Sequence, residues 1–219
     1  QGNIRNGEFE PATRVEIITS KMMRGETVPY IKEVNLPCMR FLEVDINFSL
    51  DYTLGDTASL EEMINNSVIE KLDNFQVRTL RRDDFFVHLC SHLYKEATTL
   101  PWIEMKRDMT LYKYCDIYML LNDASKEEVD FLFKRAEELL MEKVCAFSVI
   151  HTSNLFNFNN IYAVEIAEKI LSKDPDFIHT IISPEQRMEY VFTEKDILER
   201  FYADDRNTLL KGVKYSENS

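Results

Sequence analysis

The pattern of apolar and polar positions divides the chain into a short β-type part and a longer helical part. Apolar and polar residues alternate in the first fifty residues, most clearly from Val44 to Leu50, and a period of two is typical of a strand with one buried face. The pattern predicts strands over residues 14–21, 29–36 and 39–50, with a turn at residues 24–26. Three strands need cover on one face, so we expect this antiparallel meander to extend a larger sheet.

From Thr57 onward, apolar residues recur every three to four positions, as in amphipathic helices. Helix starts are indicated by Ser59, by Asp83 or Asp84, by Pro101, and by Ser125 with Glu128 as a capping box. The second of these helices should end near Ala97. The stretch from Phe75 to Leu80 fits either a short strand or a turn.

The helix that begins at Pro101 is predicted to run unbroken to Leu121 and to be central, because it is apolar nearly all round. The helix after Ser125 carries an apolar stripe as far as Val144. Weaker helical patterns cover residues 146–155, 162–171 and 194–201, the last capped by Thr193. The polar tail from Asp204 is expected to fray.

These patterns predict an α+β fold, with a small antiparallel or mixed β part in residues 1–56 and a helical bundle in residues 57–219. Only 5 glycines and 6 prolines occur in 219 residues, which favours long helices over many short strands. The net charge of −12 argues against binding of bulk nucleic acid, which needs a basic face. The negative charge does not exclude binding of a nucleotide in complex with a metal ion.

Cysteine usage and hydropathy indicate a cytoplasmic protein without a membrane span. The four cysteines, at positions 38, 90, 115 and 145, form no Cys-x-x-Cys pair and are expected to be free thiols in a reducing compartment, mostly buried. No apolar run approaches the 18 residues that a transmembrane helix requires.

Two acidic residues in the best predicted strand could bind a metal ion. Glu43, Asp45 and Asn47 lie on one strand face at a period of two. Adjacent carboxylates repel unless water or a cation lies between them, and such oxygen pairs hold Mg²⁺ against substrate phosphates. The alternative is the polar outer face of an ordinary antiparallel strand.

A histidine pair marks the helix that precedes Ala97. His88, His92 and Glu96 are spaced at i, i+4 and i+8 and share one stripe. Such a set could bind Zn²⁺, although the His-Glu-x-x-His pattern is absent. A partly buried, hydrogen-bonded histidine pair is the commoner outcome.

Charged residues also interrupt the apolar stretch from Trp102 to Leu121. Asp108 and Asp116 are eight positions apart, and Lys113 lies between them. Because buried charges need partners, we expect a network in which these two aspartates contact His88 and His92. The same residues could instead line a ligand cleft.

The residues around these positions resemble a known family. The stretch His88-Leu-Cys-Ser-His92-Leu-Tyr-Lys-Glu96-Ala, then Trp102, then Arg107-Asp108-Met-Thr-Leu-Tyr-Lys113-Tyr-Cys-Asp116-Ile-Tyr, resembles the helical part of the bacterial family of uncharacterised nucleotidyltransferases. Members of that family often occur near peptide natural-product systems. The likeness extends from about Val15 to about Tyr202.

The resemblance implies a nucleotidyltransferase fold, in which an Asp-x-Asp strand follows a Gly-Ser turn and a third carboxylate lies on a later strand. It implies Mg²⁺-dependent transfer of a nucleotidyl group from an NTP to an acceptor. Glu43 and Asp45 would be catalytic and metal-binding. The residues that would bind substrate are His88, His92, Lys95, Asp108, Lys113 and Asp116.

The chain departs from the family pattern in one respect. No Gly-Ser turn followed by an Asp-x-Asp strand precedes Glu43, so we expect the chain to lack the first catalytic strand. The alternative function is a non-catalytic module that binds a peptide or protein partner.

Overall fold

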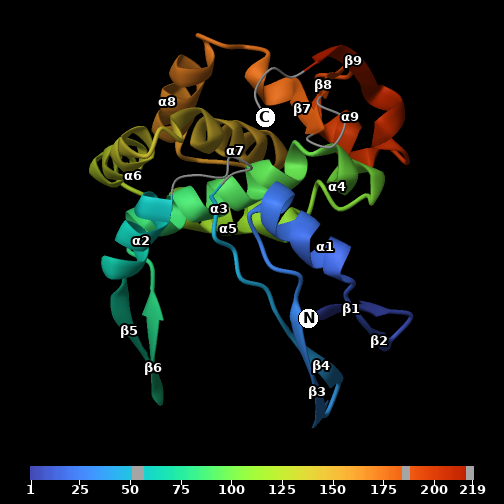
Figure 1. Ribbon diagram of the computed structural model, residues 1–219. Coiled ribbons are helices and arrows are strands. Elements are labelled where there is room, and N and C mark those ends of the chain that lie inside the picture. The colour runs from blue at the N-terminus through green and yellow to red at the C-terminus, as the bar shows by residue number, and fades with distance from the viewer. Residues whose placement is uncertain (51–56, 184–187, 216–219) are drawn as a thin grey trace. The chain divides into compact units, whose positions relative to one another are not determined.

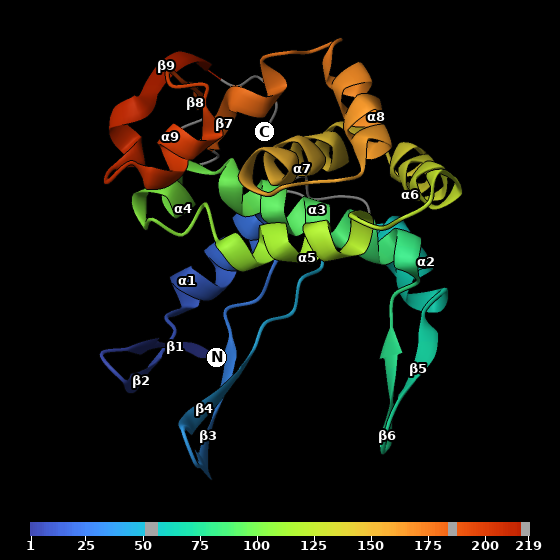
Figure 2. The ribbon, with the colours of Figure 1, turned by 180° about the vertical axis from the view of Figure 1, so that it is seen from behind.

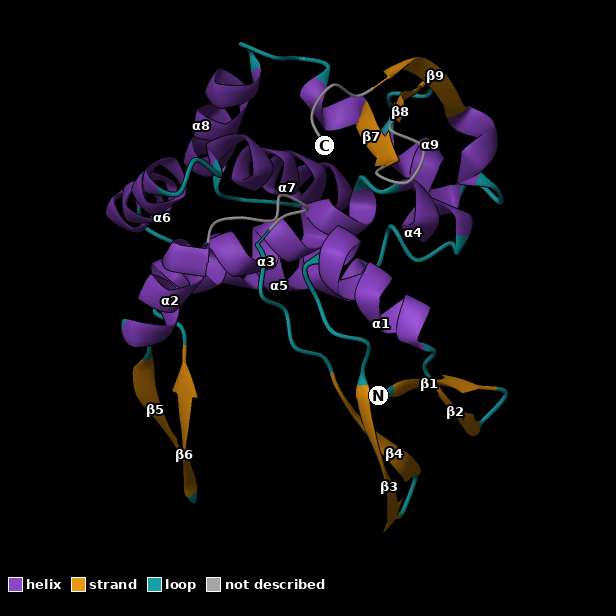
Figure 3. Cartoon of the chain, viewed as in Figure 1, coloured by secondary structure: helices purple, strands orange, loops and turns teal. Residues whose placement is uncertain are grey.

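The computed structural model describes residues 1–50, 57–183 and 188–215 (Figure 1). The chain divides into two compact units, Gln1–Glu61 and Glu62–Ser219. Both helices and small antiparallel sheets are present (Figure 3), which confirms the predicted α+β fold. In the part of the chain that the structure describes, no helix is both long and apolar enough to cross a membrane.

The N-terminal unit contains two separate hairpins. Strands β1 (Gly2–Arg5) and β2 (Glu8–Pro11) pair around Asn6-Gly7. Both turn residues have positive φ, 51° and 79°, as a tight hairpin turn requires. Strands β3 (Tyr30–Leu36) and β4 (Met39–Val44) form the second hairpin. The predicted three-strand meander is therefore wrong, because its first strand is a helix.

Helix α1 (Arg14–Thr19) occupies the segment predicted as the first strand. A capping box begins it: the Glu16 amide donates to Thr13 Oγ1 at 3.2 Å, and the Thr13 amide donates to Glu16 Oε2 at 2.7 Å. A π-helical turn, η1 (Ser20–Arg24), continues the helix until Gly25, whose φ of 61° ends it. Local capping thus outweighs the strand-like pattern of Val15, Ile17 and Ile18, and the side chains of Val15 and Ile18 are exposed.

Strand β4 ends at Val44, earlier than predicted. Beyond it, the Thr27 amide donates to the Ile46 carbonyl at 2.9 Å and the Phe48 amide donates to the Gly25 carbonyl at 2.8 Å. The backbone around Asn47 therefore runs beside the chain near Glu26 as an isolated antiparallel bridge. Asp45 lies in the irregular link between the strand and this bridge.

Helix α2 (Thr57–Asn65) leads from the first unit into the second. A hairpin of β5 (Val68–Leu72) and β6 (Phe75–Thr79) follows, which resolves the open choice at residues 75–80 in favour of a strand. The helices of the bundle come next (Figure 2). They are α3 (Arg82–Ala97), α4 (Leu100–Glu104), α5 (Leu111–Leu121), α6 (Lys126–Glu138), α7 (Glu142–Leu155) and α8 (Ile161–Leu171).

Helices α3 and α7 form the centre of the bundle. Helix α3 packs against α5, α6 and α7, and α7 also contacts α8. Helix α7 buries residues on all sides, including Val144, Phe147 and Thr152. Helix α5 is instead amphipathic, with Tyr112 and Met119 exposed. The predicted central role of the stretch from Trp102 to Leu121 is therefore wrong.

Two predicted helices are each broken by a residue with positive φ. Lys106, with φ of 58°, separates α4 from α5, and Leu140, with φ of 57°, separates α6 from α7. The left-handed conformation ends a helix because it turns the chain away from the helix axis. The apolar period continues across both breaks, so periodicity alone predicts one long helix at each.

The C-terminal segment forms a sheet. Strands β7 (Thr180–Ser183), β8 (Met188–Phe192) and β9 (Leu210–Tyr215) are antiparallel in the order β7-β8-β9. Helix α9 (Ile197–Tyr202) lies between β8 and β9 and is capped by Asp196, not by Thr193. Two single-turn 3₁₀ helices, η2 (Phe177–His179) and η3 (Arg206–Leu209), flank the sheet elements. The tail predicted to fray is thus structured as far as Tyr215.

A buried ion pair joins α3 to α6. Arg135 Nε on α6 donates to Asp84 Oδ1 on α3 at 2.7 Å, and both side chains are buried. Arg135 also pairs with the more exposed carboxylates of Glu62 and Glu138. Asp84 is therefore the partner of a buried arginine as well as an acidic residue in the first turn of α3.

Replacement of Asp84 by alanine should destabilise the protein strongly. Breaking a buried ion pair costs about 3–5 kcal/mol because the remaining charge stays buried. Glu138→Ala removes a half-exposed partner of the same arginine and should cost less than about 1 kcal/mol. Urea unfolding of the two variants checks this, and equal losses of unfolding free energy would contradict it.

Candidate functional site

The structure places the two predicted metal-binding carboxylates in the N-terminal unit. Glu43 lies on β4 and Asp45 follows the end of that strand, and both side chains are exposed. Among the described residues, no group of three or more histidine, cysteine, aspartate or glutamate side chains could hold a metal ion. The pair could therefore supply at most part of a Mg²⁺ shell, and phosphate oxygens and water would complete it.

The helical unit gathers a cluster of ionisable side chains on α3 and α5, which we call the α3–α5 cluster: His88, His92, Lys95, Glu96 and Lys113. The rings of His88 and His92 are parallel, with centroids 6.2 Å apart and 4° between their planes. This stacking confirms the predicted stripe, because residues four apart share one helix face.

Lys113 of α5 reaches across to α3. Its ammonium donates to His92 Nε2 at 3.0 Å and forms an ion pair with Glu96. His92 Nε2 lies 3.6 Å from Glu96 Oε1. Because an ammonium group can only donate, His92 must accept at Nε2 and carry its proton on Nδ1. A lysine therefore occupies the place between His92 and Glu96 that the zinc alternative would give to a metal.

Both histidines of the cluster are held neutral. Burial lowers the pKa of His88. Burial, and then the charges of Lys113, His88 and Lys95, lower the pKa of His92 to about 4. Lys95 and Lys113 are themselves buried, at 5% exposure each. Burial is thus the largest cause of the low pKa of His92, and the ammonium groups of Lys113 and Lys95 add to it.

Asp108 and Asp116 do not join this cluster, so the predicted network of these aspartates with His88 and His92 is wrong. Asp116 is exposed on α5. Asp108 is buried at 1% exposure, and its two oxygens accept from Arg206 Nε at 2.8 Å and Arg206 Nη2 at 2.7 Å. The sequence predicts a charged partner for Asp108 but not its identity, because Arg206 is 98 residues away.

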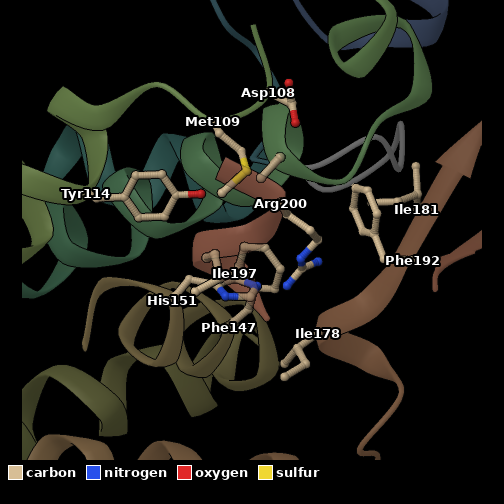
Figure 4. A pocket seen from close by; sticks show the side chains of 11 residues that line it. Asp108, Met109, Tyr114, Phe147, His151, Ile178, Ile181, Phe192, Ile197 and Arg200 are labelled. Carbon is tan, nitrogen blue, oxygen red and sulfur yellow. The ribbon is translucent and has the colours of Figure 1, made fainter. Parts of the chain in front are cut away.

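A second set of buried polar groups lies beside Asp108, around a small cavity. Figure 4 shows Arg200, His151 and Tyr114 with the apolar side chains that line it. Burial, and then the charge of Asp108, raise the pKa of Tyr114 far above its ordinary value. Sequence reasoning missed Arg200 and His151, because each lies in a short or weak helical pattern that gives no spacing signal.

Asp108 and Asp116 should differ sharply when each is replaced by alanine. Asp108→Ala leaves the guanidinium of Arg206 buried without its carboxylate, at a cost of about 3–5 kcal/mol. Asp116→Ala changes an exposed position and should stay within about 0.5 kcal/mol of the wild type. The free energy of unfolding in urea checks both values, and similar losses would contradict the burial of Asp108.

Stability should fall as the pH drops from about 6.5 to about 4. All four histidines have a lowered pKa in the folded chain: burial, the largest cause, lowers those of His88 and His151, and brings those of His92 and His179 to about 4. In this window the unfolded chain binds more protons than the folded one, so acid favours unfolding.

Unfolding free energies measured across this pH range check the prediction. The His92→Gln variant keeps an acceptor for Lys113 but cannot titrate, and should therefore lose part of the pH dependence. A wild-type profile that is flat between these pH values would contradict the prediction.

Comparison with known proteins adds a family assignment to this geometry. A family model described as uncharacterised nucleotidyltransferase matches residues 17–157, which is more than half of the chain and includes all of the α3–α5 cluster. Among curated proteins and solved structures, none matches the chain. The chain therefore belongs to the family of uncharacterised nucleotidyltransferases.

Proposed function

We propose that this protein binds a nucleoside triphosphate and transfers its nucleotidyl group to an acceptor, with the phosphates held at the α3–α5 cluster. Family membership supports the reaction class. The observation that carries the proposal is that two positively charged lysines, Lys95 and Lys113, are buried beside His92, and that Lys113 Nζ lies 3.0 Å from His92 Nε2. A site of this sign favours a phosphate anion, in a chain whose net charge is −12.

In this proposal Lys113 and the two histidines have different tasks. Lys113 is fixed by Glu96 and His92, so its ammonium is oriented before a ligand arrives, and preorganisation strengthens electrostatic stabilisation. His88 and His92 are neutral at pH 7 because of their lowered pKa values, so each ring offers one N–H donor. His92 is 39% exposed at its side chain, so a ligand can reach the cluster from solvent.

The reaction would follow the general scheme of nucleotidyl transfer. A nucleophilic atom of the acceptor attacks the α-phosphorus, the bond from this phosphorus to the bridging oxygen breaks, and pyrophosphate leaves. Negative charge increases on the leaving oxygens, so the lysines would stabilise the transition state more than the ground state.

Magnesium is a separate part of the proposal. Glu43 and Asp45 are two exposed carboxylates at i, i+2, and a minimal protein donor set for Mg²⁺ is one or two carboxylates. When bound, the ion would supply the positive charge with which Mg²⁺ assists phosphoryl chemistry.

Thermal unfolding with nucleotides tests the phosphate site. A triphosphate in EDTA at a hundred times its dissociation constant should stabilise the wild type by about 2.7 kcal/mol. Lys113→Met should lose most of this gain, whereas Lys134→Met removes an exposed lysine of α6 and should keep it. No stabilisation of the wild type would refute nucleotide binding and favour the peptide- or protein-binding alternative.

The same assay with Mg²⁺ tests the carboxylates. Added Mg²⁺ should stabilise the wild type, and Asp45→Asn should abolish only this stabilisation. Glu70→Gln, which removes an exposed carboxylate of β5, should not. An identical Mg²⁺ effect in both variants would refute the role of Asp45 and leave the phosphate site untouched.

A further inference from the structure

Arg200 presents a charged group that the proposed function does not use. It lies on α9, which packs against α7, and it is only 3% exposed. The face of its guanidinium lies 4.6 Å from the ring centroid of Phe192. Its Nε and Nη2 are buried and find no acceptor among the described residues. Since guanidinium stays protonated in proteins, these two N–H groups are buried donors on a positive charge.

Arg206 uses its Nε and Nη2 atoms, the same two donors that are unpaired in Arg200 among the described residues, to bind a carboxylate. Its Nε and Nη2 hold the two oxygens of Asp108 at 2.8 Å and 2.7 Å, the bidentate arrangement in which arginine binds anions best. Each oxygen of Asp108 already accepts from Arg206, so this carboxylate acts on Arg200 only through space, as do Glu194 and Asp196. The fork of Arg200 therefore has the geometry of an anion site, and no anion of the described residues is in contact with it.

Arg200 borders a cavity. The cavity has a volume of about 10 Å³ and is lined by Arg200, Asp108, His151, Tyr114 and Phe147 among others. Figure 4 shows the guanidinium between the ring of Phe192 on one side and the rings of Phe147 and His151 on the other. This volume holds a single particle of about the size of a water molecule. It excludes phosphate and carboxylate ligands.

The charge of Arg200 acts on two nearby histidines. Burial first, and then the charge of Arg200, lower the pKa values of both His151 and His179. The Nδ1 atoms of these histidines also have no partner among the described residues. A water molecule would satisfy hydrogen bonds here but would bring no negative charge into contact with the buried guanidinium of Arg200. A monoatomic anion would accept the hydrogen bonds and also compensate the charge of Arg200.

We propose that Arg200 and this cavity form a site for a halide ion, chloride in the cell, which joins α9 to α7. The two donors of the Arg200 fork would bind the ion, and the small volume of the cavity would exclude larger anions. The bound ion would neutralise the guanidinium and thereby hold the C-terminal segment against the helices. This site is distinct from the α3–α5 cluster.

Chloride dependence of thermal unfolding tests the proposal. Chloride is exchanged for gluconate at constant ionic strength, so that general screening is unchanged. The unfolding midpoint of the wild type should rise with the logarithm of chloride concentration above the dissociation constant. Arg200→Met should lose this rise, and Lys134→Met, which removes an exposed charge, should retain it. A wild-type midpoint that ignores chloride, or a rise that survives in Arg200→Met, would overturn the proposal.

Bromide gives a direct readout that does not depend on a variant that folds. Crystals of the wild-type protein soaked in bromide should show an anomalous peak within hydrogen-bond distance of Arg200 Nε and Nη2. A well-ordered cavity without such a peak, or with a water molecule at that position, would overturn the proposal.

Discussion

The bidentate ion pair of Asp108 and Arg206 is the interaction on which the architecture of the helical unit depends. A carboxylate with 1% exposure is tolerable only with a matched cation, and Arg206 supplies it from a segment nearly a hundred residues away. The adjacent Lys106 donates to the backbone carbonyl of Asp204 at 2.6 Å. Together these contacts explain why the chain leaves the helical path between α4 and α5, and why the segment after α9 is ordered.

Capping residues and buried stripes made much of the fold predictable. Ser125 and Glu128 form the expected capping box, and α3 ends at the expected Ala97. Where prediction failed, a single residue outweighed the period around it. The cap at Thr13 converts an apparent strand into α1, and Lys106 and Leu140 in left-handed conformation divide two apparent helices. Periodicity cannot report such residues, because it averages over ten or more positions.

The candidate site was predictable to the extent that it lies on one helix face. The spacing of His88, His92 and Glu96 placed them together correctly, because helix geometry is regular. The ammonium of Lys113 between His92 and Glu96 was not predictable, because it depends on how α3 and α5 cross. The position of Arg206 was not predictable either. The sequence indicated only that the charge of Asp108 needs a partner.

The segment that must be present for folding is longer than the segment that matches the family, because the Asp108–Arg206 ion pair and Arg200 extend past the match. The family match ends at residue 157, just after α7, whereas Arg200 and Arg206 lie beyond it. A recombinant fragment cut at that boundary would keep Asp108 but lose its cation, and would expose the face of α7 that α9 covers. The unit that folds cooperatively is therefore longer than the family match. A fragment for expression should include Arg200 and Arg206 and should not end at residue 157.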